Sequence, residues 1–104
     1  MDAQMKRGLL ETCVLADLRR GESYGYQIIK NLSECIQISE STLYPILKRL
    51  EGSGCLYVKD VAHNGRLRRF YGLTVLGEQR LEELFEQWSE VIRVFEFVKK
   101  EASQ

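Results

Sequence analysis

The sequence predicts a mainly helical chain with one small β-hairpin, which places it in the α+β class. Several segments carry apolar residues at the three- and four-residue spacing of an amphipathic helix, and an Asn-Gly pair separates two short segments of strand-like pattern. Neither proline nor glycine follows Gly77, so the last helix is expected to be long. At 104 residues, with 44% hydrophobic and 29% charged side chains, the composition is typical of one globular domain.

The first helix is expected over residues 5–19 and ends before Gly21. Its apolar face is predicted to contain Leu9, Leu10, Cys13, Val14, Ala16 and Leu18. The second helix is expected over residues 24–32, with Ser23 as its N-cap and with opening amides that can hold a phosphate. Tyr24 and Tyr26, at its start, suit core packing and a contact to a nucleic-acid backbone about equally.

A third helix is expected to begin at Ser39 or Ser41, since either hydroxyl is a good N-cap, and to end at the glycines of residues 52–54. Its apolar residues, spaced by three and four, are Leu43, Ile46, Leu47 and Leu50. Its other face carries hydroxyls followed by a basic pair: Ser41, Thr42, Tyr44, Lys48 and Arg49. Side chains of these types bind phosphates and base edges in a DNA groove.

Two strands are expected over residues 56–61 and 68–73, joined by a turn that contains the Asn64-Gly65 hairpin signal. Arg66, Arg68 and Arg69 lie at or near the tip of this hairpin. A helix followed at once by a basic hairpin predicts a winged helix-turn-helix. We expect the third helix to enter the major groove of DNA and the hairpin, or wing, to lie along the backbone or in the neighbouring minor groove.

The chain resembles the PadR-type transcriptional regulators, and in length their short-chain subgroup. The resemblance spans most of residues 8–78 and rests on Ser23-Tyr24-Gly25-Tyr26-Gln27-Ile28, on residues 41–50 around Thr42-Leu43-Tyr44-Pro45, on Gly54, on Gly65-Arg66-Leu67-Arg68-Arg69-Phe70-Tyr71 and on Leu73-Thr74-Val75-Leu76-Gly77. Leu67 stands where the wing of the family often carries proline. The resemblance implies a DNA-binding repressor and supports the placement of Thr42, Tyr44 and the Gly65-Arg66 turn against DNA.

Together these arguments predict a double-stranded DNA interface formed by Tyr24, Ser39, Ser41, Thr42, Tyr44, Lys48, Arg49, Arg66, Arg68 and Arg69. The distribution of charge agrees with it, although the net charge of the whole chain is zero. Residues 39–73 hold six basic and three acidic side chains, whereas residues 74–104 hold four basic and seven acidic ones. Positive charge therefore concentrates in the segment expected to meet DNA. An ordinary solvated surface remains the alternative for Lys59 and Arg68.

The last helix is expected from Thr74, its cap, to about Lys100, a length of roughly 39 Å at 1.5 Å per residue. Its apolar residues form one stripe: Leu81, Leu84, Phe85, Trp88, Val91, Ile92, Phe95 and Val98. A stripe of this length left open to water would be a large exposed patch, which soluble monomers avoid. We therefore expect these eight residues to form a homodimer interface, as the family resemblance also implies. The predicted division is a DNA-binding domain over residues 1–73 and a dimerisation helix over residues 74–104.

A two-fold dimer presents two recognition helices about one duplex turn apart, which predicts a palindromic operator. A ligand that changes the packing of the C-terminal helices would change that spacing and release the repressor from DNA. Some members of the resembling family hold planar aromatic compounds between a pair of tryptophans at the dimer centre. By that resemblance Trp88, with Phe85 and Ile92 nearby, is a candidate site for a small planar aromatic effector. The alternative is that Trp88 only fills the dimer core.

The remaining chemistry-bearing residues predict no catalysis, cofactor or metal site. Cys13, Cys35 and Cys55 have no Cys-x-x-Cys spacing, and His63 falls in the wing turn. No nucleophile, base and orienting partner occur together, so we expect no enzyme activity. The chain has no run of eighteen apolar residues and no signal-like leader, so we expect a cytoplasmic protein. Two alternatives stay open: a winged-helix module that binds another protein, and a thiol-based sensor of the same fold.

Overall fold

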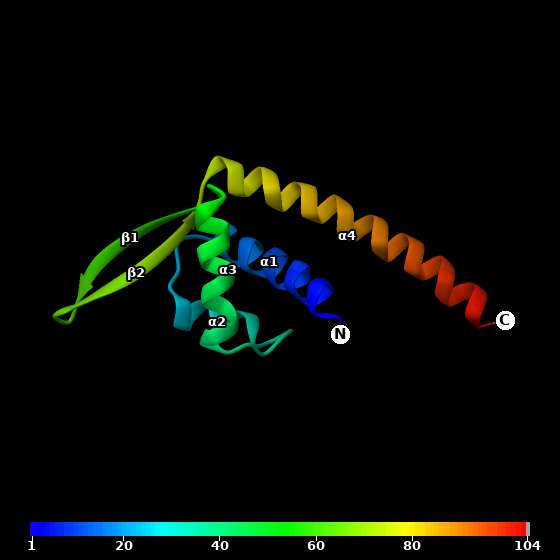
Figure 1. The fold of residues 1–104 in the computed structure, drawn as a ribbon, viewed down its shortest axis with the longest axis horizontal. Helices are drawn as coiled ribbons and strands as arrows, with labels where there is room; N and C mark the ends of the chain where they lie inside the picture. The colour runs from blue at the N-terminus through cyan, green and yellow to red at the C-terminus, as the bar shows by residue number, and fades with distance from the viewer. Residues whose placement is uncertain (104) are drawn as a thin grey trace.

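The computed structural model describes residues 1–103 and has the predicted architecture, a winged helix-turn-helix followed by one long helix. Its elements are α1 (Ala3–Arg19), α2 (Gly25–Leu32), α3 (Glu40–Gly52), β1 (Leu56–His63), β2 (Arg66–Leu73) and α4 (Val75–Ala102). The first three helices form the body (Figure 1). The hairpin and α4 project from it in opposite directions, which gives the molecule its long axis of 62 Å (Figure 1).

The core lies where α1, α2, α3, the base of the hairpin and the start of α4 meet. Its largest fully buried side chains are Leu10, Val14, Leu15, Ile28, Leu43 and Leu47. The apolar stripe predicted for α3 is confirmed, because all four of its residues are buried. In α1 the prediction was wrong at two neighbouring positions, since Leu15 is buried and Ala16 is exposed. α1 is covered by helices on more than one side, so its buried surface is wider than a single stripe.

Two of the four helices have a side chain that caps their first amides, and two do not. Asp2 caps α1 through Oδ2, which accepts hydrogen bonds from the amides of residues 4 and 5 at 3.1 and 3.2 Å. The Thr74 hydroxyl caps α4 as predicted, by accepting a hydrogen bond from the Gly77 amide at 3.1 Å. Ser39 is the N-cap of α3, but its hydroxyl contacts that of Ser41 at 2.8 Å instead of a backbone amide.

The predicted cap of α2 was wrong. The N-cap is Tyr24, with no side-chain hydrogen bond to the helix, and Ser23 instead pairs with the sheet. The Ser23 amide donates to the Tyr71 carbonyl oxygen at 3.1 Å, and the Tyr71 amide donates to that of Ser23 at 2.8 Å. The segment between α1 and α2 therefore lies beside β2 and is joined to it by a single β-bridge.

The hairpin turns at Asn64 and Gly65, as predicted from the Asn-Gly pair. Both residues have positive φ, 50° and 77°, which is the combination required by a type I′ turn. The strands pair from Leu56 with Leu73 to His63 with Arg66, two residues further toward the tip than expected on each side. A two-residue turn leaves no room for the longer loop predicted between them, so Arg66 belongs to β2.

The long helix α4 divides into a covered part and a free part. Leu81 and Leu84 are buried and Trp88 is half-buried against α1, whereas every residue from Ser89 to Lys100 is exposed in the single chain. Thr74 begins the helix and no proline or glycine interrupts it after Gly77, which explains its length. Within residues 1–103, none of the helices has the combination of length and apolar character needed to cross a membrane.

Candidate nucleic-acid interface

The exposed face of α3 is a regular stripe that mirrors its buried one. Ser41, Tyr44, Pro45 and Lys48 have the same three- and four-residue spacing as the core leucines, displaced by two residues along the helix, and all four are exposed. Pro45 was not predicted as part of this surface. Because proline has no amide hydrogen, the carbonyl oxygen of Ser41 loses its usual partner within the helix and remains available on this face. The stripe therefore offers hydroxyls, a carbonyl and one ammonium group.

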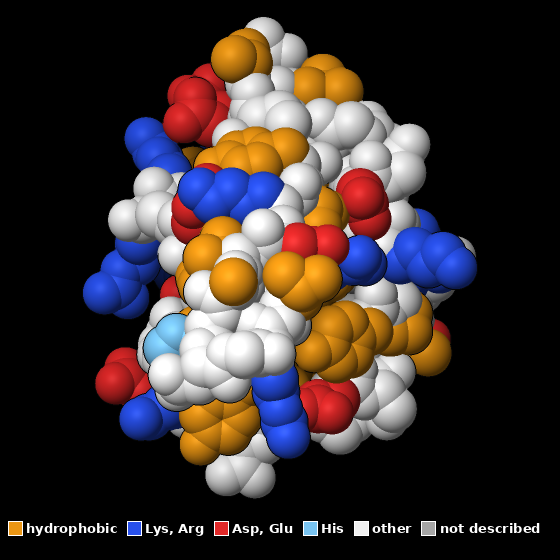
Figure 2. Space-filling model, turned by 90° about the vertical axis from the view of Figure 1, so that its left-hand side faces the viewer, with side chains coloured by type: hydrophobic (Ala, Val, Ile, Leu, Met, Phe, Trp, Pro, Cys, Tyr) orange, Lys and Arg blue, Asp and Glu red, His pale blue; other side chains and the backbone are white. Residues whose placement is uncertain are grey.

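A groove of about 950 Å³ runs between this face and the hairpin. Five of the predicted residues line it: Tyr24, Tyr44, Arg66, Arg68 and Arg69. Ser39, Ser41, Thr42 and Lys48 lie outside it, on α3 or at its start. The view onto the hairpin end shows the blue lysine and arginine side chains spread around the wing, with hydrophobic side chains between them (Figure 2). The groove and the α3 stripe thus adjoin at Tyr44, and together they present hydroxyl, aromatic and basic side chains.

Three residues that were not in the predicted site also line the groove: Gly25 and Tyr26 at the start of α2, and Glu40 at the start of α3. Tyr26 is exposed, and the buried Gly25 lies against the side chain of Tyr44. A Cβ on Gly25 would overlap the Tyr44 hydroxyl, so only glycine permits this packing. The Tyr-Gly-Tyr sequence gave the signal, since a glycine in the first turn of a helix is unusual without a close contact.

Tyr24 joins α2 to the wing. Its ring meets that of Phe70 edge to face, with centroids 5.4 Å apart, and the guanidinium of Arg68 lies 4.2 Å from the ring centroid. Such an aromatic pair and such a cation–π contact each contribute about 0.5–1.5 kcal/mol. The half-buried Tyr24 therefore has both of the roles considered for it: it packs against the wing and it lines the groove.

The three wing arginines differ in their partners. Arg69 is paired with Asp60, directly opposite on β1, through Nε and Oδ1 at 3.2 Å, and this hydrogen bond raises the pKa of Arg69. Arg68 is stacked on Tyr24. Arg66, beside the turn, has neither a carboxylate within 4 Å nor an aromatic ring beneath it among the described residues.

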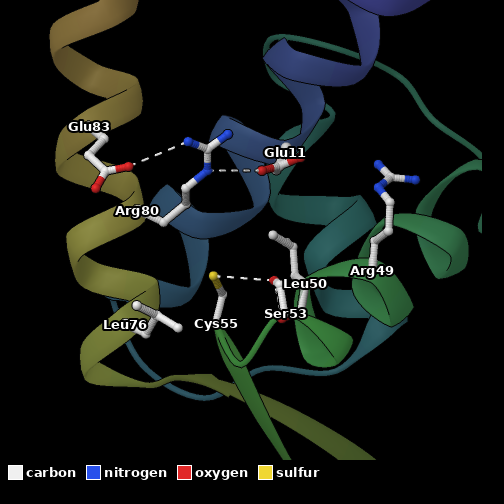
Figure 3. Close-up of a pocket in the computed structure, with 8 residues that line it drawn as sticks. All are labelled: Glu11, Arg49, Leu50, Ser53, Cys55, Leu76, Arg80 and Glu83. Atoms are coloured by element: carbon white, nitrogen blue, oxygen red, sulfur yellow. Dashed lines mark hydrogen bonds and ion pairs between the residues drawn. The ribbon is translucent and has the colours of Figure 1, made fainter.

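Arg49 does not lie on the surface predicted for it. It is about 100° further round α3 than Lys48 and reaches the rim of another hollow, of about 400 Å³, between α1, α3 and α4 (Figure 3). Arg80 crosses this hollow, with Nε 3.5 Å from Glu11 and Nη1 3.5 Å from Glu83 (Figure 3). Lys48 and Arg49 were predicted to lie together on the DNA-facing surface, but adjacent residues of a helix point about 100° apart.

The residues predicted for the dimer interface fall into two groups, some buried in their own chain and others exposed. Leu81 and Leu84, only 6% and 4% exposed, are buried within their own chain and have little surface left for a partner. Phe85, Val91, Ile92, Phe95 and Val98 are exposed. The half-buried Trp88 donates its indole hydrogen to the Thr12 hydroxyl of α1 at 3.1 Å. Val94 and Phe97 are also exposed: Val94, spaced by three and four from Val91 and Val98, borders the stripe and was missed, whereas Phe97 lies on another side of the helix.

The three cysteines differ in exposure and in their neighbours. Cys55 is buried and accepts a hydrogen bond from the Ser53 hydroxyl at 3.5 Å, whereas Cys35 is exposed. Burial, and after it the neighbouring Cys35 thiol, raises the pKa of Cys13. A raised pKa keeps the thiol protonated and therefore less nucleophilic.

Comparison with known proteins gives a consistent result. Residues 14–83 match the Transcriptional regulator PadR-like family. The chain is 32% identical over 81 residues to a transcriptional regulator of Mycobacterium tuberculosis. The aligned region covers 77% of this chain and 76% of that protein. A crystal structure of a PadR-like transcription factor from Bacteroides fragilis has a TM-score of 0.81 and 35% identity, covering 92% of this chain and 95% of the other. A PadR family transcriptional regulator from Eggerthella lenta has a TM-score of 0.81 and 33% identity, with coverages of 88% and 82%.

Proposed function

The chain belongs to the PadR-like family of transcriptional regulators, and we propose that it acts as a homodimeric repressor that reads a palindromic operator. The observation that supports this most directly is the exposed stripe of α3, which adjoins a groove lined by wing arginines. A helix of 13 residues with one apolar and one polar stripe can be buried in the protein on one side and enter a major groove on the other.

In the proposed complex Tyr44 and Lys48 lie toward base edges, and the hydroxyls of Ser41 and Thr42 bind phosphates. The first-turn amides of α2 are open to a further phosphate, because Tyr24 provides no side-chain cap. Arg66 binds the backbone or the minor groove from the wing, and Arg68 and Arg69 lie further from the turn on the same strand. Arg49 is left out of this proposal, because it lies at the rim of the hollow beside α4.

The dimer part of the proposal rests on the free half of α4. Five exposed apolar side chains follow one side of a helix that extends beyond the body of its own chain (Figure 1). A second copy related by a two-fold axis would cover this surface with an identical one. The interface we propose consists of Phe85, Trp88, Val91, Ile92, Phe95 and Val98. It omits the two leucines that the chain already buries.

Release by a small ligand is the third part of the proposal. A planar aromatic effector would bind where the two α4 helices cross, against Trp88, Phe85 and Ile92. The indole hydrogen of Trp88 already has a partner in Thr12, so the ligand would meet an apolar aromatic surface. It would lower DNA affinity only if it binds one spacing of the recognition helices better than another.

Selection of DNA by the purified chain from a pool of random duplexes tests the proposal. The expected product is a sequence with two inverted half-sites whose centres are about 10 base pairs, or a multiple of this, apart. Affinity for that duplex should fall steeply between two salt concentrations, because phosphate contacts release counterions. No enrichment above background, or affinity independent of salt, would instead favour a module that binds another protein.

A further inference from the structure

Three consecutive residues before α2 run alongside the wing. The bridge between Ser23 and Tyr71 is antiparallel, so the same register places Glu22 opposite Gly72. On the other edge of β2, Gly72 is paired with Tyr57 of β1. Glu22, Gly72 and Tyr57 therefore form one row across the sheet, with glycine in the middle.

The missing side chain of Gly72 allows the outer two residues of this row to meet. The Tyr57 hydroxyl donates a hydrogen bond of 2.5 Å to Oε2 of Glu22, and Nζ of Lys59 lies 3.0 Å from Oε1 of the same carboxylate. A Cβ on Gly72 would overlap the ring of Tyr57. Glycine weakens the interior of a strand, so its position here is explained by the close approach of this ring.

The carboxylate is held in its charged form by these contacts. The hydrogen bond from Tyr57, followed by that from Lys59, lowers the pKa of Glu22, and the same bond raises the pKa of Tyr57. One carboxylate with two donors from β1 differs from an isolated surface ion pair, because both of its oxygens are engaged. Ser23 and Tyr24 contact β2, through the bridge to Tyr71 and through the ring of Phe70. The contacts of Glu22 with Tyr57 and Lys59 attach the same segment to β1.

We propose that Glu22, Tyr57 and Lys59 form a clasp that sets the direction in which the wing projects and thereby positions Arg66 for DNA. A two-stranded hairpin has little stability of its own, so its orientation depends on what holds it at the base. The clasp residues are positioning residues and need not touch DNA. This inference rests on the proposed DNA-binding function, and the experiment separates the two.

The test is a double-mutant cycle on affinity for the selected operator. Arg66→Ala is measured in the parent chain and again in the Tyr57→Phe background, which removes one hydroxyl and keeps the ring. If the clasp positions the wing, the loss of operator affinity caused by Arg66→Ala should be at least about twofold smaller in the Tyr57→Phe background than in the parent chain. Twofold is about the lower end of the coupling found between residues of one network. A merely local stability role of Tyr57 would leave the effect of Arg66→Ala the same in both backgrounds, and that result would overturn the proposal.

Four further variants sharpen the result. Gly72→Ala should act like Tyr57→Phe, because it displaces the ring without altering either polar partner. Glu22→Gln keeps an acceptor for the Tyr57 hydroxyl and should lose less affinity than Glu22→Ala. Glu11→Gln, which breaks an ion pair on the far side of the body, is the matched control and should not couple to Arg66→Ala.

Amide hydrogen exchange of the hairpin in the free protein tests the clasp without DNA. Tyr57→Phe should speed exchange of the β1 amides that pair with β2, and unchanged exchange would overturn the clasp. If the parent chain selects no DNA while the exchange result is as expected, the proposed function fails and the clasp stands as a holder of the wing alone.

Discussion

Phe95 and Phe97 provide a matched pair for testing the α4 interface. They are 58% and 63% exposed in the single chain, yet two residues of helix separate their directions by about 160°, measured the shorter way round. Only Phe95 lies on the stripe that we assign to the dimer. Truncation to alanine at each position therefore removes the same chemical group from two different sides of the helix.

The expected cost follows from the area that only the dimer can bury. Full burial of a phenylalanine side chain contributes about 1.5–3 kcal/mol, and roughly three-fifths of that remains to be gained by Phe95 on association. Two-fold symmetry doubles the effect, so Phe95→Ala should cost about 2–3.5 kcal/mol per dimer. This corresponds to a dimer Kd raised about 30- to 300-fold.

Sedimentation equilibrium over a range of concentrations measures this Kd directly. Phe95→Ala should shift the chain toward monomer while its circular dichroism stays helical, and Phe97→Ala should leave the Kd within a fewfold of the parent value. Equal effects of the two variants would refute the assigned side of α4. A parent chain that stays monomeric at tens of micromolar would refute the dimer itself.

Three other predictions concern DNA, stability and the effector. Lys48→Ala and Arg66→Ala should each weaken operator binding, Lys48→Ala by about 1–3 kcal/mol if a base contact is lost, whereas Arg49→Ala, about 100° further round α3, should bind within about twofold of the parent in the same titration. Burial raises the pKa of Asp17 above its ordinary value of 3.8. The contribution of this residue to stability is therefore fully present below pH 3.8 and is lost as the pH rises through the higher pKa of the folded state. Asp17→Asn should therefore unfold in urea at neutral pH at a concentration no lower than the parent, and a clear loss of stability would contradict the role of desolvation. Trp88, the sole tryptophan, should be quenched by a planar aromatic ligand and less so when operator DNA is present; quenching that ignores DNA would argue against release by that ligand.

The elements that local chemistry determines could be predicted from the sequence. The buried stripe of α3 follows from the spacing of its leucines, and the turn of the hairpin follows from the need for positive φ at Asn64 and Gly65. The Thr74 cap also needs only its neighbours. In each case the partners lie within a few residues of one another, so periodicity and turn preferences contain the necessary information.

What could not be predicted depends on partners that are distant in the sequence. Glu22 and Tyr57 are 35 residues apart, and nothing in either segment indicates that Gly72 lies between them. Similarly, the α4 stripe identifies which residues are apolar on one side but not which part α1 covers. Leu81 was assigned to a partner chain for that reason, whereas it completes the core of its own.

The backbone of Cys55 joins the end of the recognition helix to the start of α4. Its amide donates to the Leu50 carbonyl at 2.9 Å, its carbonyl accepts from the Thr74 amide at 3.1 Å, and Gly77 packs so closely on this carbonyl that a Cβ would overlap it.

This joint ties α4 to α3, and the packing of Leu81, Leu84 and Trp88 ties it to α1, so α4 is attached to the body as a lever of about 42 Å. A rotation of the chain by roughly 5° about the far end of this lever displaces the other end by about 4 Å, roughly two-thirds of a helical turn. In the proposed dimer the far ends are held together, so the same rotation would appear at the recognition helices as a change in their separation. The spacing between the half-sites of the operator would then select one angle of the lever.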